Sequence, residues 1–307
     1  MGFWDDIDRI NDRGKIKAKT YPSQNETKKA SELNDVDAHN LLKEEILALE
    51  KNVDIVILTA VEDEYKAVCN VFSPKLIEQY ENGYKYSIFS LKSVDKHMTV
   101  AVFRQNEMGM VYASLTATKA INKCNPQIVL MCGVCAGIEG KTNLGDLVVF
   151  SPVYDYGSGK YVSGVFMPDF RQCRIDERLR SIVEQMIDDD NLIRQIKDSW
   201  QHNIGNPETE LRIHIYPSGS GAAVITDDIV INEIKSHQRT IGAIDMESYA
   251  IAEVARTTSL PWLIVKGVQD FANPLKNDTY REYSAHVSSM FLKAFLEKFF
   301  EMNFSTL

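Results

Sequence analysis

The sequence predicts an α/β protein, a three-layer α/β/α sandwich around a central mixed sheet, with an N-terminal arm. Continuous aliphatic runs such as VDIVILTA and QIVLMCG have the composition and length of buried strands. Segments with apolar residues at helical spacing alternate with these runs, which is typical of a sheet covered on both faces. With 307 residues, 44% of them hydrophobic, the chain can bury one large core.

Residues 1–50 are expected to form the arm, because residues 11–40 are polar, mixed in charge and poor in aliphatic side chains. A short amphipathic helix is predicted near its end, where apolar residues recur at helical spacing: Leu41, Leu42, Ile46 and Leu49. This helix either covers the edge of the next domain or docks a partner. Residues 51–307 are expected to form a single domain.

That domain is predicted to begin with a strand in VDIVILTA and a helix in EDEYKAVCNVF. A hairpin follows in YKYSIFSL and MTVAVFR, and then a helix over about 110–123 that ends before Asn125-Pro126. QIVLMCG is a strand that leads into a glycine-rich turn, and GDLVVFSPV is the next strand. A long polar loop over 154–174 precedes a helix. Three more strands are predicted in LRIHIYPS, TIGAID and WLIVKGV. Helices are predicted to start near Asp176, Thr226, Glu247 and Thr279.

Composition excludes several classes of function. A formal net charge of −9 gives no basic face for nucleic acid, and no apolar run approaches the roughly 20 residues needed to cross a bilayer. The N-terminus lacks the features of a signal peptide, so a cytoplasmic location is expected. Five scattered cysteines predict reduced thiols. The pair Cys132 and Cys135 is either a redox or metal motif or part of a tightly packed turn, and with no histidine set nearby no metal or organic cofactor is expected.

Three acids follow predicted strands directly. Glu64 lies at a helix start after the first strand, Glu247 follows TIGAID, and Asp270 follows WLIVKGV. Each alone is compatible with helix capping, since carboxylates accept hydrogen bonds from free amides in a first helical turn. Ligands in such sheets gather at the carboxyl ends of the strands, so the three together predict a carboxylate-lined cleft there.

Five motifs in one order resemble the nucleoside phosphorylase superfamily. They are T-A-V-E-D-E, M-G-M with a following alanine near 108–113, C-G-V-C-A-G with L-G-D, D-M-E-S, and Q-D-F-A. Within that superfamily the chain is most similar to 5′-methylthioadenosine/S-adenosylhomocysteine nucleosidases, over residues 53–300. The resemblance implies a catalytic domain over 51–307 that cleaves the bond between ribose and a purine base, a small-molecule substrate and a homo-oligomer.

The resemblance also implies roles for particular residues. Glu64 would activate water, and Asp270 would protonate or hydrogen-bond purine N7. Glu247 would bind the ribose hydroxyls, with Met246 against the sugar. The segment SGSGAAVITD would contact the base. The remaining implied residues are Ala223, Val224, Phe271 and Phe170 for the base, and Gly133 and Gly137 for the glycine turn.

Departures from the family pattern refine this expectation. Gln269, Asn273 and Val134 replace the usual serine, aspartate and serine, which argues against a methylthioadenosine-type substrate. Phosphorylases of the family open with G-D-P-x-R, whereas this chain has T-A-V-E-D-E, and a carboxylate there would repel phosphate. Hydrolysis is therefore favoured over phosphorolysis. A non-catalytic sensor of nucleosides or nucleotides is the alternative from another class.

The loop over 154–174 has two interpretations. It is either a solvated lid, or its cations Lys160, Arg171 and Arg174 meet the phosphates of a nucleotide while an aromatic such as Phe170 stacks on the base. An N-terminal arm together with this longer loop resembles superfamily members that act as nucleotide-depleting effectors in bacterial antiviral defence.

Overall fold

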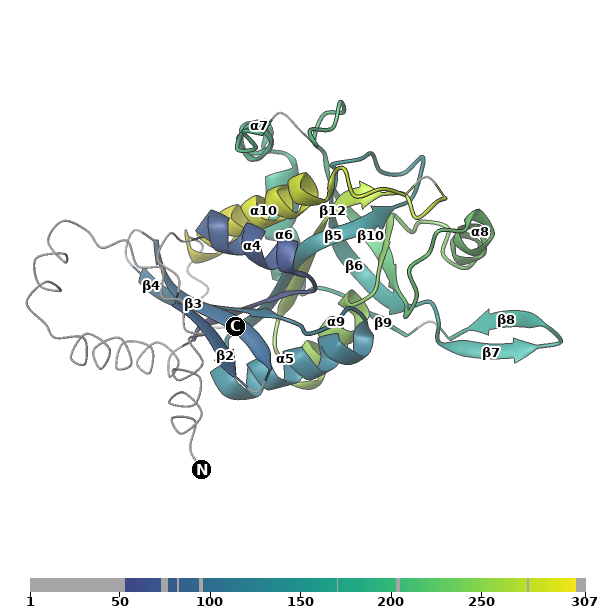
Figure 1. Ribbon diagram of the computed structural model, residues 1–307, viewed down its shortest axis with the longest axis horizontal. Helices are drawn as coiled ribbons and strands as arrows, with labels where there is room; N and C mark the ends of the chain where they lie inside the picture. Colours follow the sequence, from purple (N-terminus) through teal and green to yellow (C-terminus); the bar gives the residue numbers. More distant parts are fainter. Residues whose placement is uncertain are drawn as a thin grey trace, which may run out of the picture.

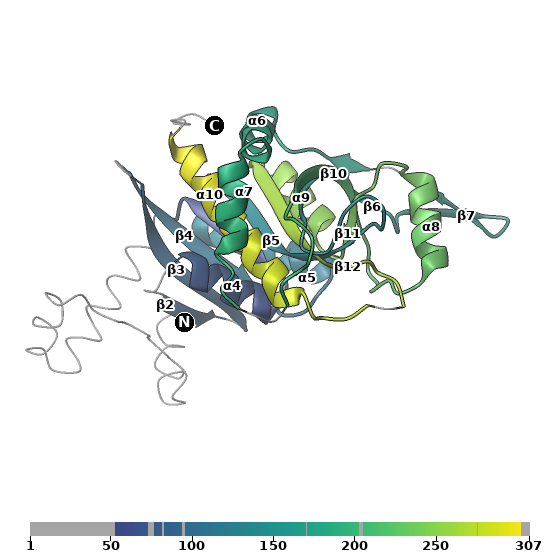
Figure 2. The same cartoon turned by 90° about the horizontal axis from the view of Figure 1, so that it is seen from above.

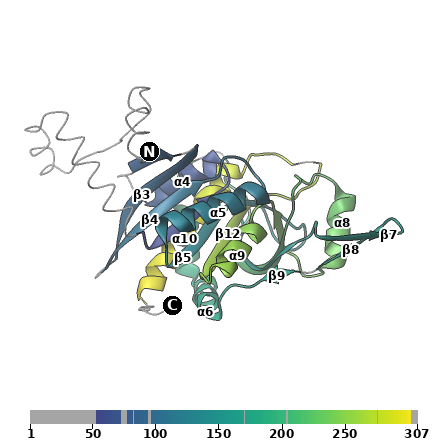
Figure 3. The same cartoon turned by 90° about the horizontal axis from the view of Figure 1, so that it is seen from below.

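The structure, a computed structural model, describes residues 53–72, 77–81, 83–93, 96–169, 171–202, 205–274 and 276–301. The arm and amphipathic helix predicted over residues 1–50 lie outside this range. One large mixed sheet forms the middle layer, with helices on both of its faces (Figures 1–3). The predicted three-layer α/β/α architecture is confirmed.

The centre of the sheet consists of four parallel strands that are almost entirely buried. Their aliphatic side chains face helices on both sides, which explains why these stretches show no alternation of polar and apolar residues. Neighbouring strands run in the order β4 (Lys96–Arg104), β1 (Ile55–Thr59), β5 (Ile128–Gly137) and β12 (Trp262–Asp270). Because the four strands are parallel, their carboxyl ends meet at one edge.

The sheet extends on both sides of this centre. Beyond β4 lie two antiparallel strands, β3 (Tyr84–Ser93) and β2 (Ile77–Glu81). Beyond β12, the order is β6 (Leu147–Asp155), β10 (Ile213–Ser220) and β11 (Ala243–Asp245), with β9 (Gln172–Cys173) paired to β6. β11 also pairs with β5, so that part of the sheet curls back on itself.

Helices cover the two faces in separate groups. On one face α4 (Glu62–Phe72) packs against α10 (Arg281–Glu301), with α6 (Glu177–Ile187) and α7 (Asp190–Asp198) beside them (Figure 1). On the other face α5 (Met110–Cys124) packs against α9 (Ser248–Thr257) (Figure 3). α8 (Asp228–His237) lies farther out, near the β7–β8 hairpin (Figure 2). Among the described helices, none is long and apolar enough to cross a membrane.

Several elements differ from the sequence-based prediction, and β2 and β9 are strands that it did not include. The loop over 154–174 contains a hairpin of β7 (Gly159–Val162) and β8 (Val165–Pro168), which projects from the molecule (Figure 1). The helix predicted from about Asp176 is followed by a second one, α7. The glycine-rich turn expected after QIVLMCG is a continuation of β5 to Gly137, because that segment pairs with β12 and β11.

Candidate active site

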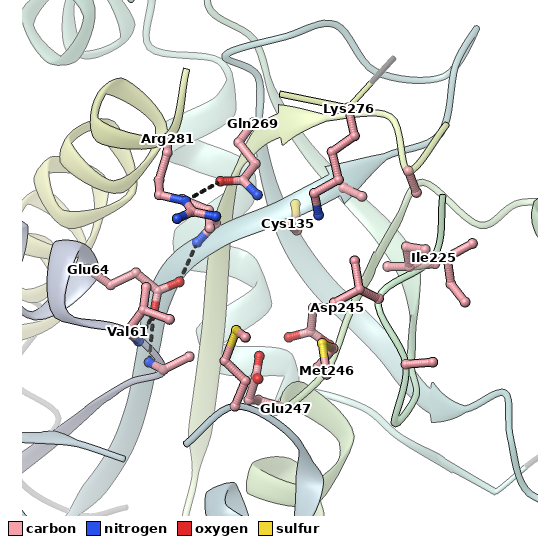
Figure 4. A pocket seen from close by; sticks show the side chains of 18 of the residues that line it. Val61, Glu64, Cys135, Ile225, Asp245, Met246, Glu247, Gln269, Lys276 and Arg281 are labelled. Atoms are coloured by element: carbon pink, nitrogen blue, oxygen red, sulfur yellow. Dashed lines mark hydrogen bonds between the residues drawn. The ribbon is translucent and has the colours of Figure 1, made fainter. Parts of the chain in front are cut away.

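A cavity of about 310 Å³ opens at the carboxyl ends of β1, β5 and β12. Its walls come from segments far apart in the sequence: the start of α4, the middle of β5, the loop after β10, the β11–α9 junction and the segment after β12 (Figure 4). The side chains that line it include Val61, Glu64, Met108, Val134, Ile225, Asp245, Met246, Glu247, Gln269, Lys276 and Arg281. Four of the described lining residues are carboxylates and two are cations.

Glu64 is the acid of α4 that faces this cavity. Its Oε2 accepts hydrogen bonds from the amides of Ala60, at 2.6 Å, and Val61, at 3.2 Å. Its Oε1 accepts from the amide of Val134, at 2.8 Å. The buried carboxylate is therefore fixed by backbone donors from the end of β1 and from within β5, in the cavity wall.

Glu62 has a different environment although it lies only two residues away. It pairs with Lys85 at 2.9 Å and Arg104 at 2.8 Å. Burial raises the pKa of Glu62, but these cations outweigh that effect and lower it below its usual value. The acids at the start of α4 thus divide into an ion-paired residue outside the cavity and a cavity residue, Glu64.

Gly133 allows the close contact between β5 and Glu64. A Cβ atom at Gly133 would lie 2.0 Å from Oε1 of Glu64, far inside van der Waals contact. At Gly137 a Cβ would instead lie 2.3 Å from Oγ1 of Thr142 and 2.7 Å from Cγ1 of Val268. Gly133 therefore serves the site, whereas Gly137 serves packing between strands.

Lys266 lies beneath the cavity floor and was not identified from the sequence. It occupies the middle of β12, is 0% exposed, and its ammonium group lies among three carboxylates. The distances from Nζ are 3.4 Å to Asp245 Oδ2, 3.6 Å to Glu247 Oε2 and 4.0 Å to Glu64 Oε1. Burial opposes the charge on Lys266, but the three carboxylates outweigh it and raise its pKa. The signal in the sequence was a lone lysine inside the apolar strand WLIVKGV.

Asp245 ends β11, and its side chain caps the first amide of the helix that begins three residues later. Its carboxylate accepts hydrogen bonds from the backbone amide and hydroxyl of Ser248 and from the hydroxyl of Ser220, the last at 2.7 Å. It also lines the cavity and contacts Lys266, so its role is wider than capping.

Glu247 is buried at the mouth of the sheet, next to Met246, which also lines the cavity. Its Oε1 accepts a hydrogen bond from the amide of Gly109 at 2.9 Å and a longer one from Gln105 Nε2 at 3.4 Å. Burial raises its pKa, Lys266 lowers it, and nearby Asp245 raises it again, with a net value of about 7. Glu247 therefore changes charge near neutral pH.

Asp270 ends β12 and is held by three donors. Its Oδ1 accepts a hydrogen bond from the amide of Ala272 at 2.8 Å. Its Oδ2 accepts a hydrogen bond from Gln269 Nε2 at 2.9 Å and lies 3.3 Å from Lys276 Nζ. Asp270 lies just behind the cavity lining, to which its neighbours Gln269, Ala272 and Lys276 belong. Gln269, which departs from the family pattern, accepts from Arg281 Nε at 3.2 Å and so connects that cation to Asp270.

A family model described as the phosphorylase superfamily matches residues 54–301. The chain belongs to this superfamily. A curated relative, the uncharacterized protein y4jS of Sinorhizobium fredii, is 33% identical over 191 residues, which cover 60% of this chain and 46% of the relative. ATP nucleosidase Cap17 of Escherichia coli is 24% identical over 259 residues, 79% of this chain and 51% of the relative. The chain thus spans about half the length of these two relatives.

Solved superfamily structures share the fold. The 5′-methylthioadenosine/S-adenosylhomocysteine nucleosidase of Helicobacter pylori, solved in complex with a substituted pyrrolidin-3-ol, has a TM-score of 0.64 at 18% identity and covers 81% of this chain and 99% of its own. The futalosine hydrolase of the same organism has a TM-score of 0.63 at 19% identity and covers 80% of this chain and 98% of its own.

The other residues expected to belong to a superfamily site are placed differently. Ala223 and Val224 line the cavity, while Phe271 packs against the hydrophobic core. The three cations of the projecting loop are exposed and are not among the described cavity-lining residues: Lys160, Arg171 and Arg174. Phe170 lies outside the described residues. Roles for these residues in base or phosphate binding stay predictions.

Proposed function

We propose that this chain is a purine nucleosidase that hydrolyses the N-glycosidic bond of a purine nucleoside or nucleotide. The observation that carries the proposal is that Glu64 and Glu247 face one cavity while Asp270 stands at its edge, each supplied by a different strand end. Separated carboxylates on either side of a scissile glycosidic bond can assist water attack and departure of the leaving group.

In this mechanism Glu64 accepts the proton of a water molecule that adds to C1′ as the bond to the base breaks. Glu247 accepts hydrogen bonds from the ribose 2′ and 3′ hydroxyls, and these strengthen as positive charge develops on the sugar. Asp270 is proposed to interact with N7. The purine leaves as a neutral base because it gains one proton there, which balances the proton that Glu64 takes from water. The products are the free base and ribose or ribose phosphate.

The charge around Glu64 supports water as the nucleophile. Glu64, Asp245 and Glu247 surround the single ammonium of Lys266, so three carboxyl groups face one cation where the proposal places C1′. An inorganic phosphate bound at this position would be repelled. The similarity to proteins named ATP nucleosidase and 5′-methylthioadenosine/S-adenosylhomocysteine nucleosidase also favours hydrolysis.

The test is incubation of the protein with adenosine, inosine, guanosine, methylthioadenosine, AMP and ATP, with and without phosphate, followed by chromatography. Free base and unphosphorylated ribose from a nucleoside, independent of added phosphate, are expected. Release that requires phosphate and yields ribose 1-phosphate would establish a phosphorylase instead. The Glu64→Gln variant should bind ligand and release no base, and binding by the wild type without turnover of any substrate would indicate a sensor.

A further inference from the structure

Two cations stand at the cavity, and the proposed hydrolysis gives neither of them a role. Lys276 and Arg281 belong to the segment that follows β12, and they are the only lysine or arginine among the described lining residues. In the view of Figure 4 they enter the cavity from the side opposite Met246 and Glu247. The cavity therefore has a basic side, near Asp270, and an acidic side, around Glu247.

The stereochemistry of a nucleoside matches this division. In a β-nucleoside the 2′ and 3′ hydroxyls lie on one face of the ribose ring, and the base and C5′ lie on the other. A sugar whose hydroxyls meet Glu247 therefore presents its base and its 5′ substituent to the opposite side. Asp270, the residue proposed to address the base, is 3.3 Å from Lys276 and is linked to Arg281 through Gln269.

The contacts that hold the two cations can be exchanged for an anionic ligand. Arg281 pairs with Asp278 at 2.7 Å, but the Asp278 side chain is 59% exposed, and exposed pairs are weak. Lys276 is partly exposed and can reach a ligand, although its partner Asp270, at 3.3 Å, is buried. An arginine fork and a flexible ammonium group are the pair of donors that commonly bind phosphate oxygens.

We propose that Lys276 and Arg281 form a phosphate subsite of this cavity and that the preferred substrate is a purine nucleoside 5′-phosphate. This inference rests on the proposed nucleosidase function and specifies its substrate class. The 5′-phosphate takes the place of Asp278 beside Arg281 and draws Lys276 toward itself. The subsite differs from the predicted contacts with Lys160, Arg171 and Arg174, because its cations line the cavity itself.

The experiment compares steady-state cleavage of matched substrates that differ only in the phosphate. Adenosine, AMP and ATP are assayed with the wild type and with Lys276→Met and Arg281→Gln, and guanine and hypoxanthine series are run in parallel to find the preferred base. Lys235→Met and Arg239→Gln are the controls, because these exposed cations lie on or just after α8 and do not line the cavity.

The wild type should have a higher kcat/KM for a nucleotide than for its nucleoside. Each cavity variant should lower kcat/KM for the nucleotide by about 10- to 100-fold, mainly through KM, as expected for loss of a charge-assisted hydrogen bond. For the nucleoside kcat/KM should fall clearly less than for the nucleotide, because Lys276 and Arg281 also support Asp270. The control variants should match the wild type for both substrates.

Equal losses for nucleoside and nucleotide would overturn the subsite, since they would show that the two residues support the fold or the chemistry instead. Equal kcat/KM values for nucleoside and nucleotide in the wild type would also overturn it, while leaving the nucleosidase intact. Absence of base release from every substrate would refute the nucleosidase itself. If a cavity variant folds poorly, calorimetric titration of AMP and of adenosine into the Glu64→Gln variant tests the subsite instead. AMP is expected to bind more tightly than adenosine, and equal binding of the two would contradict the subsite.

Discussion

Replacement of Lys266 by methionine should destabilise the protein strongly and in a pH-dependent way. The ammonium group is fully buried and lies 3.4–4.0 Å from oxygens of three carboxylates. Removing one partner of a buried ionic cluster leaves uncompensated charge and costs about 3–5 kcal/mol of unfolding free energy. For a domain of this size, that loss corresponds to a decrease in Tm of roughly 6–20 °C.

The pH dependence follows from the carboxylates that remain. Burial already raises the pKa of Glu247 to about 7 in the wild type, so the folded state holds a proton there that the unfolded state loses above about 4.5. Stability from this group is therefore present at low pH and is lost as pH rises from about 4.5 through 7. Without Lys266 the carboxylates hold protons more tightly, so the destabilisation should be larger at pH 8 than at pH 5.

Urea denaturation of Lys266→Met and wild type at pH 5 and pH 8 measures this effect. Lys235→Met is the matched control, because it removes an exposed lysine from α8. A change in unfolding free energy below about 0.5 kcal/mol at pH 8, which is typical of surface substitutions, would refute the electrostatic account of the cluster. A loss of stability that is larger at pH 5 than at pH 8 would also refute it.

Three further predictions concern activity. Wild-type kcat/KM for base release should rise as pH increases through about 7, because Glu247 must ionise to accept hydrogen bonds from both ribose hydroxyls. The Glu247→Gln variant should have a kcat/KM lower by about tenfold or more, and its kcat/KM should no longer rise with pH. Gly133→Ala should lower kcat by about 100-fold with a small change in Tm, because the added Cβ displaces Glu64. Gly137→Ala should mainly lower Tm, and the opposite pattern in the two variants would contradict these roles. Gln105→Leu should raise KM less than tenfold, because the Gly109 amide still holds Glu247, and a larger kcat effect would show that Gln105 contacts the reacting atoms.

The sequence predicted the layers and most elements because buried parallel strands leave continuous aliphatic runs. It did not predict the β7–β8 hairpin, whose exposed residues include Tyr161 and Val165 and which therefore lacks the pattern of a packed strand. It identified Glu64 and Glu247 as site residues, and both line the cavity. Local spacing could not show that Glu62 faces cations, since Lys85 and Arg104 are 23 and 42 residues away.

The cations of the site were harder to predict than its acids. Lys266 is one lysine in an apolar strand, and only the folded sheet shows that three carboxylates from separate segments surround it. Lys276 and Arg281 lie in the segment after the last strand, where nothing in the local pattern separates a cavity residue from a solvated one. Only the folded chain shows that these two side chains line the cavity.

The double pairing of β11 has a mechanical consequence for the site. This strand has only three residues, yet it is bonded to β10 on one side and to β5 on the other. β5 also supplies the Val134 amide that holds Glu64, while the segment leaving β11 carries Glu247. Glu64 and Glu247, the acids proposed to activate water and to hold the sugar, are thus tied to the same hydrogen-bonded strands. In the proposed mechanism, the distance between the two acids is therefore set by the sheet and not by the loops around the cavity.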